Sequence, residues 1–323
     1  MKSQKIKQYR LAEDALFRSY GLEREEHFIQ IERLGIQVRA QVVGNGNPLL
    51  LVHGGPNAGS TWADLASMLP DYQCILLDRP GCGLSEPMKS TRWSKQLLTD
   101  LIVSTTDSVL DYFQHDHIPV VGSSFGGYWA LNYTLQRPER VDQLILEGCP
   151  AMVEGMAVPA FMKSMTAPIL RWLIPKLPTS KSYSKKIMKD IGHTYSVENN
   201  VLSEIFIDWY VSLSNNTDTM KNEVAVLSKV LSGGKMHPEY VLPDNEIQKI
   251  TQPTLWLWGE DDPFGGVEIG ERIHSQMKNS QFIGFQNSGH LPWLDNPTEH
   301  AARIKEFIIS TRSVRLPRNP TTS

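Results

Sequence analysis

Short apolar runs recur along the chain, and each has the length of a strand that is buried on both faces. Helix-like patterns, with apolar positions three and four residues apart, occupy most of the gaps between these runs. Strands that alternate with helices predict an α/β fold with a doubly wound, mostly parallel sheet. The predicted strands cover residues 36–43, 49–52, 74–77, 118–121, 144–146, 254–258 and 282–285. The predicted helices of this sheet cover residues 60–69, 94–114, 125–136, 266–277 and 297–310.

The segment between the first two predicted strands is dense in turn-forming residues. Residues 44–48 read Gly-Asn-Gly-Asn-Pro. Such a segment between two apolar stretches is typical of a β-hairpin, so we expect the strands at 36–43 and 49–52 to pair with each other.

The alternation of strands and helices breaks between residues 150 and 245. This segment contains several helical stretches, many Met and aromatic residues, and no obvious strand. We therefore expect a helical cap at 150–245, inserted between the two parts of an α/β core at 26–149 and 246–312. Residues 1–25 are expected to form an accessory element with an amphipathic helix at 5–20, and the polar residues 313–323 a disordered tail.

The composition indicates an ordinary soluble globular protein. Of the 323 residues, 41% are hydrophobic and 21% are charged, which suffices for a substantial core. The net charge of −3 provides no basic surface for nucleic acid or an anionic membrane, and no apolar run is long enough to span a bilayer. The charged N-terminal residues lack the apolar stretch of a signal peptide, so we expect a cytoplasmic protein.

The cysteines argue against two kinds of site. Cys74, Cys82 and Cys149 are widely spaced, odd in number and form no C-x-x-C pair. A disulfide framework or a zinc site is therefore not expected. Cys82 lies between glycines in a predicted loop and is the one cysteine considered for reactivity.

The main chemical signal is a nucleophile motif. Ser124 lies at the centre of Gly-Ser-Ser-Phe-Gly-Gly at 122–127, which matches G-x-S-x-G directly after a predicted strand and directly before a predicted helix. A serine on such a tight turn exposes its hydroxyl, and the helix below offers free N–H groups to a developing oxyanion. Ser123 fits the motif less well, because Val121 occupies the position of the first glycine.

A general base and an acid are expected at the ends of two later strands. His290 follows the strand at 282–285, and an imidazole that titrates near neutrality suits proton transfer. Glu260, Asp261 and Asp262 follow the strand at 254–258. We favour Asp262 as the partner of His290, with Asp261 as the alternative. Glu147, at the end of another strand, is a more distant candidate.

A glycine-containing loop follows the strand at 49–52 and reads His53-Gly-Gly-Pro. We expect the backbone N–H groups of Gly55 and Phe125 to form an oxyanion hole. His53 is expected to brace this loop through hydrogen bonds instead of acting as a base.

Taken together, these motifs resemble the successive signatures of the lidded α/β-hydrolase superfamily. The resemblance extends from about residue 30 to 312, and the insert lies where that family has its cap. It implies a triad of Ser124, Asp262 and His290, with no metal and no organic cofactor. The segments that carry the resemblance are residues 53–56, 78–85, 122–127, 258–263 and 289–292. The loop at 78–85 is implied to be structural.

The resemblance leaves the reaction open. Relatives that cleave epoxides or carbon–halogen bonds have an aspartate at the elbow, which Ser124 argues against. Proline iminopeptidases share the H-G-G-P loop but usually have Trp where this chain has Phe125. Ring-cleavage C–C hydrolases resemble the W-G-x-D-D segment but usually have a different glycine loop. We expect a small, neutral, apolar carboxylic ester, lactone or thioester as the substrate, with C–C hydrolase, aminopeptidase and non-catalytic binding protein as alternatives.

The cap is expected to line the substrate pocket. Phe206, Trp209 and Tyr210 recur at helical spacing, so one helix face is apolar. This face either contacts substrate or docks the cap on the core. Three carboxylates of the cap remain candidates for binding a substrate amine: Glu154, Glu198 and Glu204. The substrate-binding candidates are Trp172, Phe206, Trp209 and Leu291.

Overall fold

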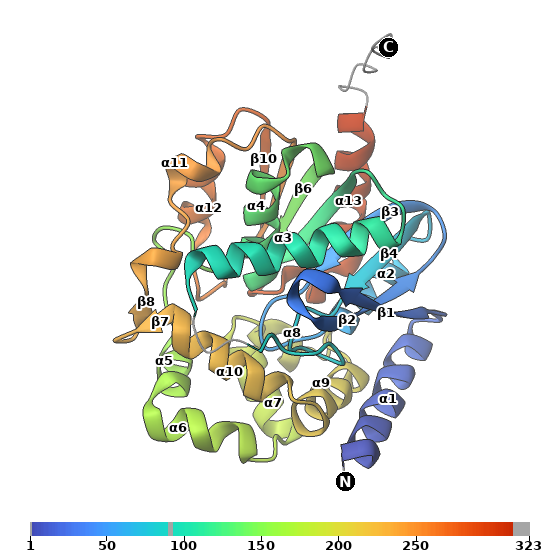
Figure 1. The fold of residues 1–323 in the computed structure, drawn as a ribbon, viewed down its shortest axis with the longest axis vertical. Coiled ribbons are helices and arrows are strands. Elements are labelled where there is room, and N and C mark those ends of the chain that lie inside the picture. The colour runs from blue at the N-terminus through green and yellow to red at the C-terminus, as the bar shows by residue number, and fades with distance from the viewer. Residues whose placement is uncertain (1, 90–92, 313–323) are drawn as a thin grey trace.

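A computed structural model describes residues 2–89 and 93–312, without the side chains of Thr166, Pro168 and Ser232. Within these residues, eight strands form one sheet in the order β1-β2-β4-β3-β5-β6-β9-β10 (Figure 1). The pairs β1–β2 and β2–β4 are antiparallel and the remaining pairs are parallel, which confirms the predicted α/β class with a mostly parallel sheet. The strands are β1 (Glu25–Ile31), β2 (Ile36–Val43), β3 (Asn47–Val52), β4 (Tyr72–Leu77), β5 (Ile118–Ser123), β6 (Val141–Glu147), β9 (Thr254–Gly259) and β10 (Ser280–Phe285).

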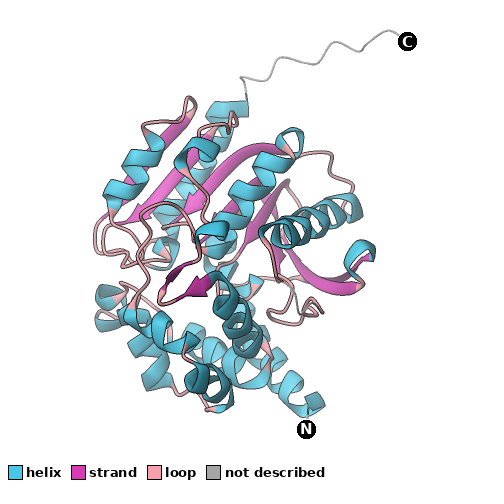
Figure 2. Ribbon diagram, turned by 60° about the vertical axis from the view of Figure 1, so that its left-hand side comes forward, coloured by secondary structure: helices cyan, strands magenta, loops and turns pink. Residues whose placement is uncertain are grey.

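The central strands are apolar because helices cover both faces of the sheet (Figure 2). In β3, for example, the side chains from Leu49 to Val52 are fully buried. The covering helices are α2 (Ala63–Ser67), α3 (Lys95–Tyr112), α4 (Phe125–Gln136), α12 (Val267–His274) and α13 (Pro297–Arg312).

The predicted hairpin between β2 and β3 is wrong, because β4 lies between these two strands. It pairs antiparallel with β2 and parallel with β3. The turn-rich segment instead passes the start of β4, where the N–H of Asn47 donates to the carbonyl of Asp71 at 3.0 Å. Turn residues allow the chain to reverse, but they do not determine which strand becomes the neighbour of β2 in the sheet. The apolar end of β4, residues 74–77, is buried because this strand lies between β2 and β3.

The edge strand β1 was not predicted. This strand lies at the edge of the sheet, and its sequence, EEHFIQI, is polar at several positions. Charged residues on an edge strand discourage pairing with other chains, and they also hide the strand from a search for apolar runs.

The regular structure between β6 and β9 is mostly helical, and we call residues 150–245 the cap. A two-residue hairpin of β7 (Leu231–Ser232) and β8 (Lys235–Met236) is the one strand pair found there among the described residues. The helices are α5 (Ala160–Thr166), α6 (Pro168–Leu173), α7 (Lys181–Asp190), α8 (Thr194–Glu198), α9 (Glu204–Asn216), α10 (Thr219–Val230) and α11 (Asp244–Ile247). The helices from α5 to α10 gather on one side of the sheet, whereas α11 lies against α4 of the core (Figure 1).

The N-terminal helix α1 (Lys2–Ser19) packs against α9 of the cap. Its buried Glu13 forms an ion pair with the core. The carboxylate of Glu13 accepts from the guanidinium of Arg39 on β2 at 2.8 Å, and Arg39 also donates to Asp78 at 2.7 Å. Burial alone would raise the pKa of Glu13, but the charge and hydrogen bonds of Arg39 outweigh it and lower that pKa to about 2. The ionised Glu13 therefore ties α1 to the sheet.

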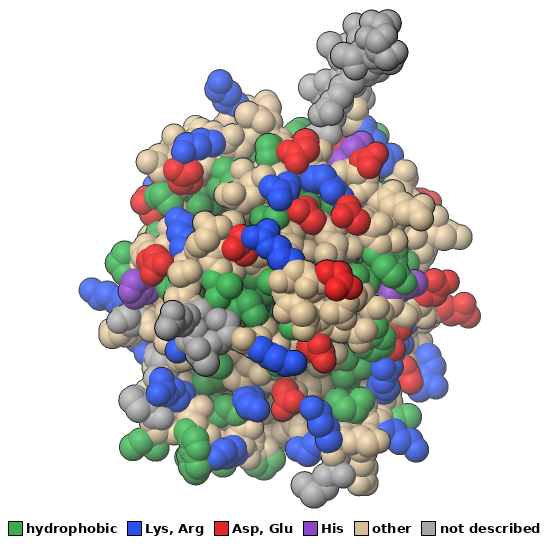
Figure 3. All heavy atoms as spheres, in the orientation of Figure 1, with side chains coloured by type: hydrophobic (Ala, Val, Ile, Leu, Met, Phe, Trp, Pro, Cys, Tyr) green, Lys and Arg blue, Asp and Glu red, His purple; other side chains and the backbone are tan. Residues whose placement is uncertain are grey.

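On the face shown in Figure 3, basic and acidic side chains are interspersed. No helix among the described residues has both the length and the apolar character needed to cross a membrane. The predicted disordered tail, 313–323, lies outside the described residues.

Candidate active site

Ser124 occupies the turn between β5 and α4. Its φ of 53° lies in the left-handed region, which non-glycine residues seldom adopt. The turn is tight because α4 begins close to β3, where a Cβ on Gly126 would lie 2.0 Å from the carbonyl oxygen of Val52. Ser123 is fully buried, whereas Ser124 is partly exposed and lines a cavity. The hydroxyl available to a ligand is therefore that of Ser124.

The imidazole of His290 is paired with the carboxylate of Asp262. Nδ1 of His290 lies 2.8 Å from Oδ2 of Asp262. Asp262 also accepts from the backbone N–H groups of Cys149 and Phe264, each at 2.9 Å, so its ionised form is well solvated by the protein. A carboxylate at Nδ1 favours the tautomer with its proton there and a lone pair at Nε2. Among the described residues, Nε2 has no hydrogen-bond partner.

The two alternative acids lie elsewhere. Asp261 is exposed and contacts Ser288 only through its backbone N–H. Glu147 is buried against His300, with Oε2 2.8 Å from Nδ1. Of the three carboxylates considered, the fold brings Asp262 to His290.

The cap holds the loop that carries His290. The backbone N–H of His290 donates to the carbonyl of Ile191 at 2.9 Å, and that of Leu291 donates to Nε2 of His193 at 3.2 Å. Nδ1 of His193 in turn lies 2.8 Å from Asp295. The ring of Phe264 packs on the imidazole of His290, with ring centroids 4.0 Å apart. These contacts restrict the rotation of His290.

The loop after β3 lies directly against Ser124. A Cβ on Gly54 would come within 2.7 Å of Cβ of Ser124, so the backbone can approach the nucleophile only with glycine there. His53 braces this loop as expected: Nδ1 contacts the carbonyl of Gly54 at 2.6 Å, and Nε2 accepts from the N–H of Arg79 at 3.1 Å. Burial, and then the charge of Arg79, lower the pKa of His53 well below its usual value, so the ring is neutral.

The proposed oxyanion donors also line this cavity. Phe125 begins α4, and the first N–H groups of a helix have no partner within it. Among the described residues, no hydrogen bond donated by the backbone N–H of Gly55 is found. Both groups are thus available to a ligand.

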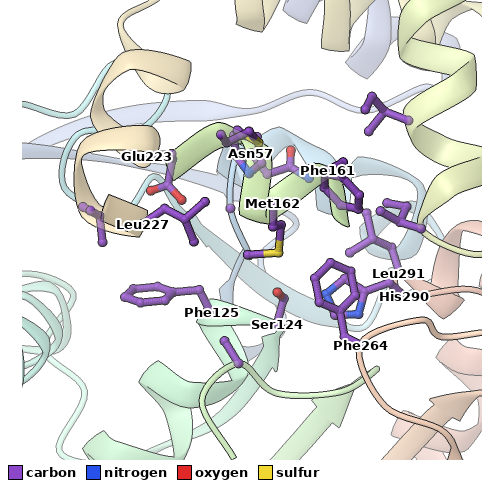
Figure 4. A pocket seen from close by; sticks show the side chains of 18 of the residues that line it. Asn57, Ser124, Phe125, Phe161, Met162, Glu223, Leu227, Phe264, His290 and Leu291 are labelled. Carbon is purple, nitrogen blue, oxygen red and sulfur yellow. The ribbon is translucent and has the colours of Figure 1, made fainter. Parts of the chain in front are cut away.

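The cavity lies between the core and the cap and encloses about 1000 Å³, open in part to solvent. Figure 4 shows the hydroxyl of Ser124 pointing into it, beside Phe264 and His290. Methionine and other apolar side chains dominate its wall. The side chains contributed by the cap are Ala151, Met152, Met156, Phe161, Met162, Met165, Ile187, Met188, Ile191, Tyr210, Glu223, Val226, Leu227, Val230 and Met236.

Of the four substrate-binding residues expected from the sequence, Leu291 lines the cavity and the other three do not. Trp172 is 65% exposed on α6, where Nζ of Lys176 lies over its ring. Phe206 and Trp209 are buried in an aromatic cluster on α9, the helix that packs against α1. Both side chains are buried away from the cavity, and of this cluster only the adjacent Tyr210 lines it.

A carboxylate of the cap that the sequence analysis did not consider lies on the cavity wall. Glu223 of α10 pairs with Nη2 of Arg79 and accepts from the thiol of Cys82, both at 3.1 Å. The guanidinium of Arg79 lies 4.6 Å from the ring centroid of Phe125. Burial, and then the charge of Glu223, raise the pKa of Cys82 well above its usual value, which disfavours a reactive thiolate. An acidic residue in an amphipathic helix offers no local signal of such a role.

Within residues 2–89 and 93–312, no cluster of three or more His, Cys, Asp or Glu side chains could hold a metal ion. The groups that the site presents for chemistry are the hydroxyl of Ser124, the imidazole of His290, the carboxylate of Asp262 and backbone N–H groups.

Comparison with known proteins identifies relatives along most of the chain. The uncharacterized hydrolase YugF of Bacillus subtilis is 27% identical over 269 residues, which cover 80% of this chain and 89% of YugF. A 2-hydroxy-6-oxononadienedioate/2-hydroxy-6-oxononatrienedioate hydrolase of Paraburkholderia phymatum is 27% identical over 290 residues, which cover 87% and 93% of the two chains. The crystal structure of carboxylesterase CesB from Bacillus subtilis superposes with a TM-score of 0.73 at 19% identity and covers 95% of this chain and 99% of its own. Residues 49–303 match the model of the alpha/beta hydrolase family, and the chain belongs to that family.

Proposed function

We propose that this hydrolase is a serine hydrolase that cleaves small, neutral, apolar carboxylic esters, or closely related lactones or thioesters. The observation that carries the proposal is the paired Asp262 and His290, whose free Nε2 lies on the same apolar cavity as Ser124. A nucleophile, an acid and a base in the chain order Ser, Asp, His are typical of α/β hydrolases that carry out acyl transfer.

The reaction proceeds in two acyl-transfer steps. The oxygen of Ser124 attacks the ester carbonyl while Nε2 of His290 takes its proton, and Asp262 stabilises the resulting imidazolium. The N–H groups of Gly55 and Phe125 donate to the tetrahedral oxyanion. The C–O bond to the leaving group then breaks, and His290 returns the proton to the departing alcohol. Water, deprotonated by His290, hydrolyses the acyl-enzyme and restores Ser124.

The charge of the cavity wall favours a neutral substrate. Among its described lining residues are one carboxylate, Glu223, and no lysine or arginine. Arg79 lies behind this wall and already donates to Glu223 and to the carbonyls of His53 and Gly54. A charged group that enters without a partner loses its hydration, which is costly.

Cleavage of a C–C bond is the second candidate, and the relative from Paraburkholderia phymatum favours it. The Paraburkholderia hydrolase is named for a dioate, a substrate with two carboxylates. Such a dianion would meet Glu223 and find no cationic side chain on the wall. An aminopeptidase could use Glu223 to hold a substrate amine, but the charge of this carboxylate is already balanced by Arg79.

The proposal is tested by labelling with a fluorophosphonate probe. The purified protein should be labelled and should hydrolyse p-nitrophenyl butyrate, whereas the Ser124→Ala variant should do neither and still fold. The Ser123→Ala variant is the matched control and should keep both properties, because its hydroxyl is buried away from the cavity. Labelling of Ser124→Ala would show that another residue is the nucleophile, whereas no labelling of the parent protein would favour a non-catalytic binding role.

A substrate panel distinguishes the rival reactions. Neutral p-nitrophenyl esters should give a higher kcat/KM than aminoacyl arylamides or vinylogous diketones that carry carboxylates. A preference for either charged class would replace the ester proposal with the corresponding alternative. A small-molecule substrate, no contact with nucleic acid or membrane, and a cytoplasmic location remain our predictions.

A further inference from the structure

The cap contains a second apolar cavity, which we call the cap chamber. It encloses about 1020 Å³, open in part to solvent. Its wall is formed by α5, α7 and α9 and by the segment after α6. The lining side chains that belong to the chamber alone are Ser164, Ile174, Leu177, Pro178, Thr179, Tyr183, Ser184, Ser214 and Met220.

The cap chamber adjoins the catalytic cavity. Five residues line both: Pro56, Phe161, Met165, Ile187 and Tyr210. Because the same side chains face both cavities, the two are separated by no more than one layer of side chains. Met165 has three rotatable side-chain bonds and can adapt its shape to a passing chain.

The chemistry of the chamber wall suits a hydrocarbon. Among its described lining residues no side chain is ionised at neutral pH, and its polar groups are hydroxyls. One of these, Oγ of Ser184, is buried without a hydrogen-bond partner. At the other end the chamber reaches the surface, where Leu177 and Tyr183 are 55% and 54% exposed.

Two further apolar side chains are exposed on α6, the helix at the lower left of Figure 1 that precedes the chamber-lining Ile174 and Leu177. Ile169 is 77% exposed and Trp172 is 65% exposed. The cap chamber therefore shares part of its wall with the catalytic cavity and also has apolar lining side chains that reach the surface.

We infer that the cap chamber continues the catalytic cavity, and that the substrate is an ester with a long, unbranched apolar chain that extends from Ser124 past Met165 and Ile187 into the cap. This inference rests on the proposed function and extends its substrate class from small apolar esters to long-chain ones. The chain moves from water to an apolar wall, and each methylene buried in this way stabilises the bound transition state. The rate constant kcat/KM should therefore rise about fourfold for each added methylene until the chamber is full.

The inference is tested by two substrate series and two blocking variants. The first series varies the acyl chain of p-nitrophenyl esters from acetate through butyrate and octanoate to dodecanoate, and the second varies the alcohol of alkyl acetates over the same lengths. Ser184→Phe and Ser214→Phe each place a ring in the chamber from a different helix, α7 or α9. Either variant should lower the ratio of kcat/KM for the longest to that for the shortest ester by at least about tenfold.

Ser182→Phe is the matched control, because Ser182 lies on α7 next to the chamber-lining Tyr183 but is itself exposed and does not line the chamber. It should leave the ratio unchanged. Thermal unfolding of all variants checks folding, and Ser214→Phe keeps the test valid if Ser184→Phe does not fold.

The outcomes separate the inference from the function on which it rests. Failure to cleave any ester of either series would overturn the proposed function itself. Cleavage of short esters with no gain in kcat/KM along either series would overturn the chamber inference alone. A gain that neither blocking variant reduces would also overturn it, because the chain would then bind elsewhere.

Discussion

At the scale of single residues, Asp262 shows how the backbone prepares a side chain for one role. Its carboxylate accepts hydrogen bonds from the backbone N–H groups of Cys149 and Phe264 and also contacts the imidazole of His290. Asp261, the preceding residue, points to solvent. Two adjacent aspartates thus differ in environment, because the turn after β9 buries one and exposes the other.

The variant Asp262→Asn should lower kcat by about 10⁴-fold, because an amide can favour the wrong tautomer of His290. Steady-state kinetics on p-nitrophenyl butyrate measure this loss. The neighbouring Asp261→Asn serves as control and should stay within about twofold of the parent enzyme, since an exposed side chain that touches no catalytic group has little effect. Equal losses in both variants would contradict the assignment.

At the scale of elements, the cap both covers the cavity and positions the catalytic loop. His193, just before α8, accepts the backbone N–H of Leu291 and contacts Asp295, which also accepts from the N–H of Gly289. The loop around His290 is therefore held on both sides by one histidine–aspartate pair, so His193 acts as a positioning residue.

The variant His193→Ala should lower kcat by about tenfold to a hundredfold with little change in KM, because a small displacement of His290 misaligns proton transfer without altering the apolar wall. His193→Gln should recover part of the loss, since its amide can both accept and donate. The control is His117→Ala. His117 lies just before β5, and its ring pairs with Asp142 of β6. A rise in KM with unchanged kcat would instead assign His193 to substrate binding.

The aromatic cluster of α9 is buried inside the molecule. Trp209→Ala should lower the free energy of unfolding by about 3–5 kcal/mol, because a fully buried indole leaves a large cavity. Trp172→Ala, on an exposed ring, should change it by less than about 1 kcal/mol. Denaturant unfolding of the two variants measures the difference. A large change in KM without loss of stability in Trp209→Ala would instead assign Trp209 to the substrate pocket.

At the scale of the whole molecule, one buried charge network joins three distant parts of the chain. Glu13 of α1 and Asp78 after β4 both contact Arg39 of β2. Since α1 also packs against α9, the N-terminal helix links the cap to the sheet. Removal of one partner from such a network leaves an uncompensated buried charge, which is strongly destabilising.

The variant Glu13→Gln should therefore be less stable than the parent protein by about 3–5 kcal/mol at neutral pH. The pKa of Glu13 is lowered from 4.5 to about 2 on folding, so the stability that its charge contributes is complete above pH 4.5 and is lost as the pH falls toward 2. The stability difference between the two proteins should shrink over that range, as urea unfolding at several pH values would show. Asp78 and Glu26, the other carboxylates that face Arg39, are present in both proteins. A constant difference across this range would refute the role given to the Glu13 charge.

Much of this molecule follows from the sequence alone, because the signals are local. Apolar runs marked the central strands, and the α/β fold with a mostly parallel sheet is confirmed. The pattern around Ser124 depends on a strand, a turn and a helix within a few residues, so its position could be predicted. The ends of parallel strands meet at one edge of a sheet, which explains why Asp262 and His290, predicted separately, lie side by side.

The remaining features depend on which surfaces meet in three dimensions. The sequence predicted a hairpin, yet burial of β4 placed that strand between β2 and β3. An apolar stripe on α9 has the same periodicity whether it faces substrate or α1, and only packing decided that Phe206 is buried away from the cavity. Glu223 and His193 carry no local signal, because their partners, Arg79 and Leu291, are about a hundred or more residues away along the chain. Periodicity determines the face of an element on which a side chain lies, but only the tertiary structure determines what that face meets.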